Sequence, residues 1–107
     1  MHIVFYGAGG IGGYFGGRLL AAGEQVSFVA RGRHAQAMRE HGLHVKSPLG
    51  DVQVAVPSIS DDPAALPAAD LVVFAVKMPD AEAAAARLAP LMKAGTVVLP
   101  LQNGVEI

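Results

Sequence analysis

The chain contains no cysteine among its 107 residues. This absence excludes disulfide bonds and thiolate metal sites, and it fits a protein of the reducing cytoplasm. Long apolar runs are also missing, because none approaches the roughly 20 residues that a membrane-spanning helix needs. The amino terminus has no basic segment and does not resemble a secretion signal. We therefore expect a cytoplasmic protein with no membrane partner.

Excess charge of either sign is missing as well. The formal net charge is −1 and only 16% of the residues are charged, so the chain has no general attraction for nucleic acid. Hydrophobic residues, in contrast, make up 52% of the chain, which is enough for a packed core. The length predicts a single domain that spans residues 1–107.

Short apolar runs alternate with segments of helical character along the chain. The runs are typical of buried parallel strands and lie at residues 2–6, 25–30, 71–76 and 96–101. Helical spacing and composition predict helices at residues 11–22, 33–41 and 79–92, of which the last contains Pro90 and is expected to kink or end early there.

Residues 43–47 and 51–56 alternate between apolar and polar positions and predict a hairpin. Residues 60–70 predict a polar connection with one short helical turn. The alternation of strands and helices predicts an α/β fold with a mainly parallel sheet and helices on both faces.

The first predicted strand is followed by a G-x-G-x-x-G pattern made of Gly7, Gly9 and Gly12. Between a strand and a helix, these glycines allow a tight turn, a close approach of a pyrophosphate, and close packing of the helix on the sheet. Free N–H groups at the helix start then bind the phosphates. The pattern predicts a Rossmann-type dinucleotide-binding domain, and the alternative is a turn without a ligand.

Three further glycines, Gly13, Gly16 and Gly17, lie inside the predicted helix. We interpret them as positions of close packing and not as ligand contacts, because glycine costs about 1 kcal/mol of helix stability relative to alanine. Tertiary packing must offset that cost.

An acid is missing where NAD-binding domains use one. In this fold a carboxylate about 20 residues beyond the glycines accepts a hydrogen bond from the ribose 2′-hydroxyl. Here no Asp or Glu lies between Gln25 and Arg39, and Arg31 follows the second predicted strand. A guanidinium matches a 2′-phosphate, so the sequence favours NADP(H). The alternative for Arg31 is a solvated surface residue, and for Arg33 and His34 the surface interpretation is preferred.

Two more polar residues follow predicted strands: Lys77 and Asn103. Ligands bind outside the carboxyl ends of strands in open parallel sheets, so both could meet the cofactor or substrate. Lys77 could contact a phosphate or ribose, and Asn103 could orient a nicotinamide ribose or a substrate oxygen. A strand-end lysine in water and an Asn-Gly turn remain equally open.

Taken together, the segments "GAGGIGGYFGGRLLAAG", "VARG", "SPLGDVQV", "AVKMPD" and "VLPLQNGV" resemble the N-terminal domain of ketopantoate reductase (2-dehydropantoate 2-reductase). The resemblance runs from Met1 to Ile107. Members of this family reduce ketopantoate to pantoate with NADPH, on the route to pantothenate and coenzyme A. The resemblance implies that Arg31 meets the 2′-phosphate, that Lys77 serves the cofactor and that Asn103 lies between nicotinamide and substrate. It places the pyrophosphate at Gly7, Ala8, Gly9, Gly10, Ile11 and Gly12.

The general acid and most substrate-binding residues of the family lie in a second, helical domain. This sequence contains no such domain, so no catalytic residue and no metal ligand is assigned within it. The resemblance implies that the missing domain and a small 2-keto acid are its partners. Two alternatives remain: another NADP-dependent dehydrogenase of 2-keto or hydroxy acids, and a nucleotide-binding regulatory module that performs no chemistry.

Overall fold

A computed structural model gives the fold and describes residues 1–7, 10–46, 48, 50–56, 58–74 and 86–100. Its main sheet has five parallel strands in the order β5-β2-β1-β6-β7. These strands are β1 (His2–Tyr6), β2 (Gln25–Val29), β5 (Ile59–Ser60), β6 (Leu71–Phe74) and β7 (Val97–Pro100). A separate antiparallel hairpin consists of β3 (Leu43–Val45) and β4 (Val52–Val54).

Four of the parallel strands and the hairpin confirm the sequence prediction to within one or two residues at the described ends. The predicted strand residues 47, 75, 76 and 101 lie outside the described residues. β5 was not predicted, because two residues cannot produce a periodic pattern. This strand exists through its pairing with β2, where Phe28 is aligned with Ile59.

Two helices, α1 (Gly10–Ala21) and α2 (Gly32–His41), confirm the predictions to within one residue. The predicted short turn is the 3-10 helix η1 (Pro63–Ala65). Residues 86–88 are helical and lead into the 3-10 helix η2 (Ala89–Leu91), which contains Pro90. The proline therefore ends the third helix early, as expected. Residues 79–85 of that prediction lie outside the described residues.

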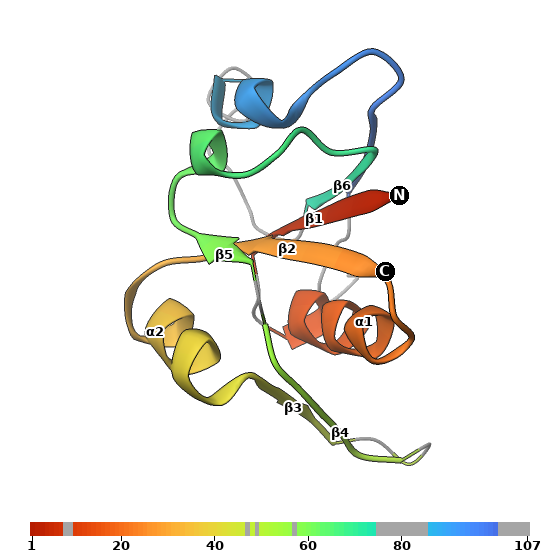
Figure 1. Cartoon of the computed structure of the whole chain (residues 1–107), viewed down its shortest axis with the longest axis vertical. Helices are drawn as coiled ribbons and strands as arrows, with labels where there is room; N and C mark the ends of the chain where they lie inside the picture. Colours follow the sequence, from red (N-terminus) through yellow and green to blue (C-terminus); the bar gives the residue numbers. More distant parts are fainter. Residues whose placement is uncertain (8–9, 47, 49, 57, 75–85, 101–107) are drawn as a thin grey trace, which may run out of the picture.

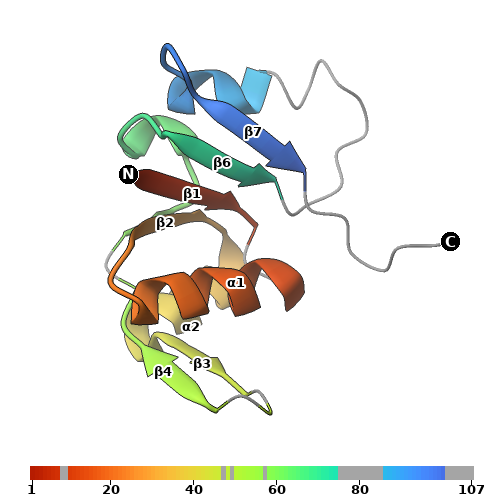
Figure 2. The same ribbon diagram turned by 90° about the vertical axis from the view of Figure 1, so that its right-hand side faces the viewer.

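α1 lies between the main sheet and the hairpin (Figure 2). A Cβ atom on Gly16 would overlap the ring of Phe28 in β2, and one on Gly17 would lie 2.7 Å from Val45 Cγ2 in the hairpin. Both contacts would be closer than a real Cβ atom tolerates. Glycine at these two positions therefore allows α1 to approach β2 and the hairpin closely. The interpretation of Gly16 and Gly17 as packing positions is confirmed, and Gly13 is buried.

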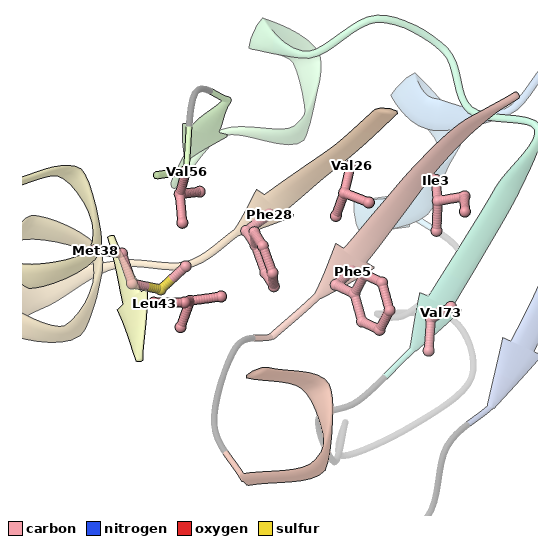
Figure 3. Packing of buried hydrophobic residues seen from close by; sticks show 8 residues of the cluster. All are labelled: Ile3, Phe5, Val26, Phe28, Met38, Leu43, Val56 and Val73. Atoms are coloured by element: carbon pink, nitrogen blue, oxygen red, sulfur yellow. The ribbon is translucent and has the colours of Figure 1, made fainter. Parts of the chain in front are cut away.

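The core has one cluster on each face of the sheet. The cluster on the α1 and α2 face combines strand residues with Met38 of α2 and Leu43 of β3, and Figure 3 shows its members: Ile3, Phe5, Val26, Phe28, Met38, Leu43, Val56 and Val73. The cluster on the opposite face joins strand residues to the η1 and η2 region and contains Val4, Tyr6, Val29, Leu66, Ala69, Val72, Leu88 and Leu91. Helical segments thus cover both faces, as Figure 1 also shows, and the fold is the predicted Rossmann-type α/β arrangement.

Candidate functional site

The carboxyl ends of the five parallel strands share one edge of the sheet. The arrowheads of β1, β6 and β7 point toward this edge in Figure 2. β1 and β2 are neighbours there, and Tyr6 is aligned with Val29. Gly7 follows the first of these strands and Arg31 comes two residues after the second. The fold therefore brings the start of the glycine motif and Arg31 to adjacent strand ends, although 24 positions of sequence separate them.

The turn after β1 requires glycine at its first position. Gly7 has a φ of 105°, a region that residues with a Cβ rarely adopt. Its N–H donates to the carbonyl of Val29 at 2.9 Å, which ties the turn to β2. α1 then begins at Gly10 with no acidic residue in its first turn, and Gly12 is buried. Ala8 and Gly9 lie outside the described residues. Ile11 belongs to α1, and nothing further is described for its side chain.

This geometry leaves the amino end of α1 at the carboxyl edge of the sheet. Unpaired N–H groups and the positive end of the helix dipole favour an anion at such a place. Because acidic side chains are absent from the first turn, none of them competes with that anion. The start of α1 is therefore a place where an anionic group can bind.

A second helix begins at the same edge. Arg31 occupies the N-cap position of α2 in an extended conformation, with φ −144° and ψ 169°, and its side chain makes no capping hydrogen bond. The first turn of α2 contains no acid, and Arg31, Arg33 and His34 are all exposed. A cationic helix start without a carboxylate fits a phosphate monoester better than a ribose hydroxyl.

Sequence reasoning missed one polar contact at this edge. Arg87 Nε donates to the hydroxyl of Tyr6 at 2.6 Å, and Arg87 Nη2 donates to the carbonyl of Asp61 at 3.3 Å. The hydrogen bond with Tyr6 raises the pKa of Arg87 above its ordinary value. Arg87 thereby connects the last residue of β1 to the loop after β5. An arginine in an alanine-rich segment of the sequence, 81 positions from Tyr6, gives no sequence signal for this contact.

A serine and a histidine meet inside the sheet, but they do not form an active site. His2 Nε2 lies 2.7 Å from Ser27 Oγ, which is 2.7 Å from Ser58 Oγ, and His2 Nδ1 lies 3.1 Å from the carbonyl of Ala68. Ser27 is 2% exposed, so a substrate cannot reach its hydroxyl. These hydrogen bonds satisfy the polar groups that are buried toward the amino ends of the strands. They do not involve the carboxyl edge of the sheet.

Other site classes have no support in the described part of the chain. No group of three His, Cys, Asp or Glu side chains that could hold a metal gathers there. Among the same residues, no helix has the length and apolar character needed to cross a membrane. Lys77 and Asn103, the remaining predicted ligand residues, lie outside the described residues.

The family model of "Ketopantoate reductase PanE/ApbA" matches residues 3–107. The chain belongs to this family. A curated ketopantoate reductase relative, the 2-dehydropantoate 2-reductase of Halobacterium salinarum, is 39% identical over 98% of this chain and 35% of its own length. Membership in the family and the Rossmann-type fold together imply a nicotinamide dinucleotide cofactor, and the glycine turn and helix start described above fit one.

Solved structures agree with this assignment. A PanE/ApbA family ketopantoate reductase from Ralstonia eutropha is 43% identical, with a TM-score of 0.83 over 97% of this chain and 35% of that chain. A D-mandelate dehydrogenase, solved with NADH and anilino(oxo)acetate, is 28% identical with a TM-score of 0.79. The chain therefore spans about a third of the length of these relatives.

Proposed function

We propose that residues 1–107 form the NADPH-binding domain of a 2-dehydropantoate 2-reductase, which reduces ketopantoate to pantoate. The observation that carries this proposal is the pairing of two helix starts at one sheet edge: the glycine turn before α1, and Arg31 before α2. The first suits a pyrophosphate, and the second suits the 2′-phosphate that distinguishes NADP from NAD.

Each residue of the proposed site has one task. Gly7 shapes the turn, and the backbone from Ala8 through Gly12 receives the pyrophosphate. Arg31 receives the 2′-phosphate through charge-assisted hydrogen bonds, and Lys77 contacts the cofactor. Asn103 orients the nicotinamide and the substrate. When bound, the reduced nicotinamide supplies hydride to the carbonyl carbon of the 2-keto acid.

The oxygen of the carbonyl gains negative charge as hydride arrives, and a positioned acid must protonate it. We assign no residue of this chain to that step, since Asn103 carries an amide without a readily released proton. We infer instead that a helical domain after residue 107, of the kind implied by the greater length of the relatives, supplies the acid and encloses the substrate. The cytoplasm is the compartment we propose for the reaction.

A second function is favoured by one comparison. The D-mandelate dehydrogenase neighbour has a similar fold and acts, by its name, on a 2-hydroxy acid. Dehydrogenation of another 2-hydroxy acid, or reduction of the matching 2-keto acid, is therefore the alternative. Both functions use the same cofactor edge, so they differ in the part of the protein that surrounds the substrate.

Turnover tests this proposal. The 107-residue chain alone should bind NADPH but should not oxidise it with ketopantoate, because loss of an acid costs about 10²–10⁴-fold and loss of positioning about 7–11 kcal/mol. A fused chain, in which residues 1–107 precede the unmatched part of the Ralstonia eutropha reductase, should oxidise NADPH with ketopantoate. Asn103→Ala in the fused chain should impair turnover.

The readout is NADPH absorbance with ketopantoate, and phenylglyoxylate, the keto acid of mandelate, serves as the competing substrate. Turnover by residues 1–107 alone would place the acid within this chain. The preference between the two keto acids is measured with the natural full-length protein, because the substrate-enclosing part of the fused chain comes from the Ralstonia eutropha reductase. A preference for phenylglyoxylate there would support the alternative function.

A further inference from the structure

The guanidinium of Arg87 reaches across the carboxyl end of β2. Its Nε atom donates to the hydroxyl of Tyr6, the last residue of β1, and its Nη2 atom donates to the carbonyl of Asp61, directly after β5. β2 lies between β1 and β5 in the sheet, and Val29 is aligned with Tyr6 on one side and with Ser60 on the other. The two hydrogen bonds of Arg87 therefore span the last residue of β2.

Arg87 reaches this place from the face of the sheet opposite α1 and α2. Tyr6 and Val29 belong to the core cluster of that face, together with Leu88, the residue next to Arg87. The starts of α1 and α2, where we propose that the phosphates bind, lie on the other side of the sheet. Arg31 follows Val29 by two residues, about 7 Å of extended chain. A nucleotide with its phosphates at both helix starts thus has Arg87 across the end of β2.

The guanidinium of Arg87 is held in one orientation and is accessible. Hydrogen bonds from two different nitrogen atoms define its plane, and its Cζ atom lies 5.9 Å from the centroid of the Tyr6 ring. The Tyr6 ring is buried and packs against Phe74 with 5.3 Å between centroids, whereas Arg87 is exposed. A flat group that is already fixed loses little conformational entropy when a ligand ring stacks on it.

The adenine base is the part of the dinucleotide that still lacks a side chain in the proposed site. The glycine turn and Arg31 receive phosphates, and both belong to the backbone or to charged groups that do not recognise a ring. Bases stack on aromatic side chains or on the guanidinium plane of arginine. Among the described residues the exposed aromatic side chain is Phe15 of α1, which is on the helix side of the sheet opposite Arg87.

We propose that the guanidinium of Arg87 is the surface on which the adenine base of the dinucleotide stacks. This inference deepens the proposed function and rests on it, because it requires a dinucleotide at the carboxyl edge. NADPH and NADH carry the same base, so Arg87 contributes equally to the affinity for both. Arg31, in contrast, contributes to the affinity for NADPH alone. The two arginines therefore divide recognition of the base from recognition of the 2′-phosphate.

Replacement of Arg87 by methionine tests the proposal, because methionine keeps an unbranched side chain and removes the flat cation. Calorimetric titration of the Arg87→Met chain should show binding of NADPH and of NADH weakened by the same factor, about 3–30-fold, the range of a cation–π contact. Arg39→Met removes an exposed arginine from the last turn of α2 and should leave both affinities unchanged. Unchanged affinities in Arg87→Met, or a loss confined to NADPH, would overturn the proposal.

Tyr6→Phe separates stacking from bracing of β1. This variant loses the hydrogen bond from Arg87 Nε, but it keeps the ring, the guanidinium and the hydrogen bond to the Asp61 carbonyl. Tyr6→Phe should therefore weaken both dinucleotides clearly less than Arg87→Met does. Equal weakening by the two variants would show that Arg87 acts only through β1 and would overturn the proposal. Circular dichroism of each variant establishes that the titrated chain is folded.

Nuclear magnetic resonance of the unmodified chain provides a test that needs no folded variant. With NADPH bound, nuclear Overhauser effects should connect the H2 or H8 proton of adenine to the Cδ protons of Arg87. Effects from these adenine protons to the Phe15 ring, with none to Arg87, would overturn the proposal.

This proposal and the proposed function can fail separately. Binding of NADPH without contact between adenine and Arg87 would contradict the stacking proposal alone. If the unmodified chain bound neither NADPH nor NADH, the proposed dinucleotide site would be contradicted, and the stacking proposal with it.

Discussion

Arg31 sets the cofactor preference that we propose, because its position after β2 is where NAD-binding domains carry an acid. A charge-assisted hydrogen bond contributes about 1.5–3 kcal/mol, which corresponds to a preference of roughly tenfold to a hundredfold for NADPH over NADH. Arg31→Ala should remove most of this difference by weakening NADPH binding while leaving NADH binding nearly unchanged. Calorimetric titration of both cofactors measures the effect.

The control for this substitution lies on the same helix. Arg39 is exposed and belongs to the last turn of α2, at the end opposite Arg31, so Arg39→Ala should leave both affinities unchanged. If Arg39→Ala weakened NADPH binding as much as Arg31→Ala, the effect would reflect general charge and not a phosphate site.

Gly16 presents a conflict between helix propensity and packing. Alanine is favoured over glycine within a helix by about 1 kcal/mol, but its Cβ would overlap the ring of Phe28. That ring is fully buried and stacks on Phe5 with 5.6 Å between centroids, so it cannot move aside freely. Overpacking of this kind costs about 1–3 kcal/mol, and Gly16→Ala should therefore lower the free energy of unfolding measured in urea. An increase would mean that propensity outweighs the overlap.

At the scale of elements, Asp70 joins three segments at the start of β6. Its carboxylate accepts the His2 N–H at 2.6 Å and pairs with Lys93 at 2.9 Å. These contacts, the His2 bond first, lower the pKa of Asp70 below its ordinary 3.8. A lowered pKa means that the stabilisation is present above the unfolded pKa and is lost as the pH falls through the folded pKa.

Asp70→Asn should consequently lower the free energy of unfolding at neutral pH. The variant should also lose less of its stability as the pH falls. Urea midpoints measured between about pH 7 and about pH 2 provide the test. Lys93→Met removes one of the two contacts but keeps the carboxylate and its hydrogen bond from His2, so it should flatten the curve less than Asp70→Asn. If the urea midpoint of the Asp70→Asn variant fell with pH as steeply as that of the unmodified chain, other carboxylates would control acid unfolding.

Several elements were predictable because their signal is local. Four buried parallel strands are apolar runs bounded by glycine or polar residues, and the helix limits lie beside Gly23 and Gly42, which both have positive φ values. β5 was not predictable, because Ile59 and Ser60 become a strand only through backbone pairing with β2. The early end of the third helix near Pro90 was predictable from the chemistry of proline, whereas the 3-10 turn Ala89–Leu91 was not part of the prediction.

At the scale of the whole molecule, part of the proposed cofactor site could be predicted from the sequence. The meeting of Gly7 and Arg31 at one edge follows once the strands are parallel, because carboxyl ends then coincide. The bridge from Arg87 to Tyr6 and Asp61 was not predictable, since it depends on how the third helical segment crosses the sheet. Lys77 and Asn103 lie outside the described residues, so their place at the edge stays a prediction.

The most direct test of the central claim is a calorimetric titration of the 107-residue chain with NADPH and, in parallel, with NADH. If the two helix starts form a dinucleotide site with a 2′-phosphate pocket, the chain binds NADPH at one site, roughly tenfold to a hundredfold more tightly than NADH. Equal affinities would contradict the role of Arg31, and an absence of binding by either cofactor would contradict the dinucleotide site itself.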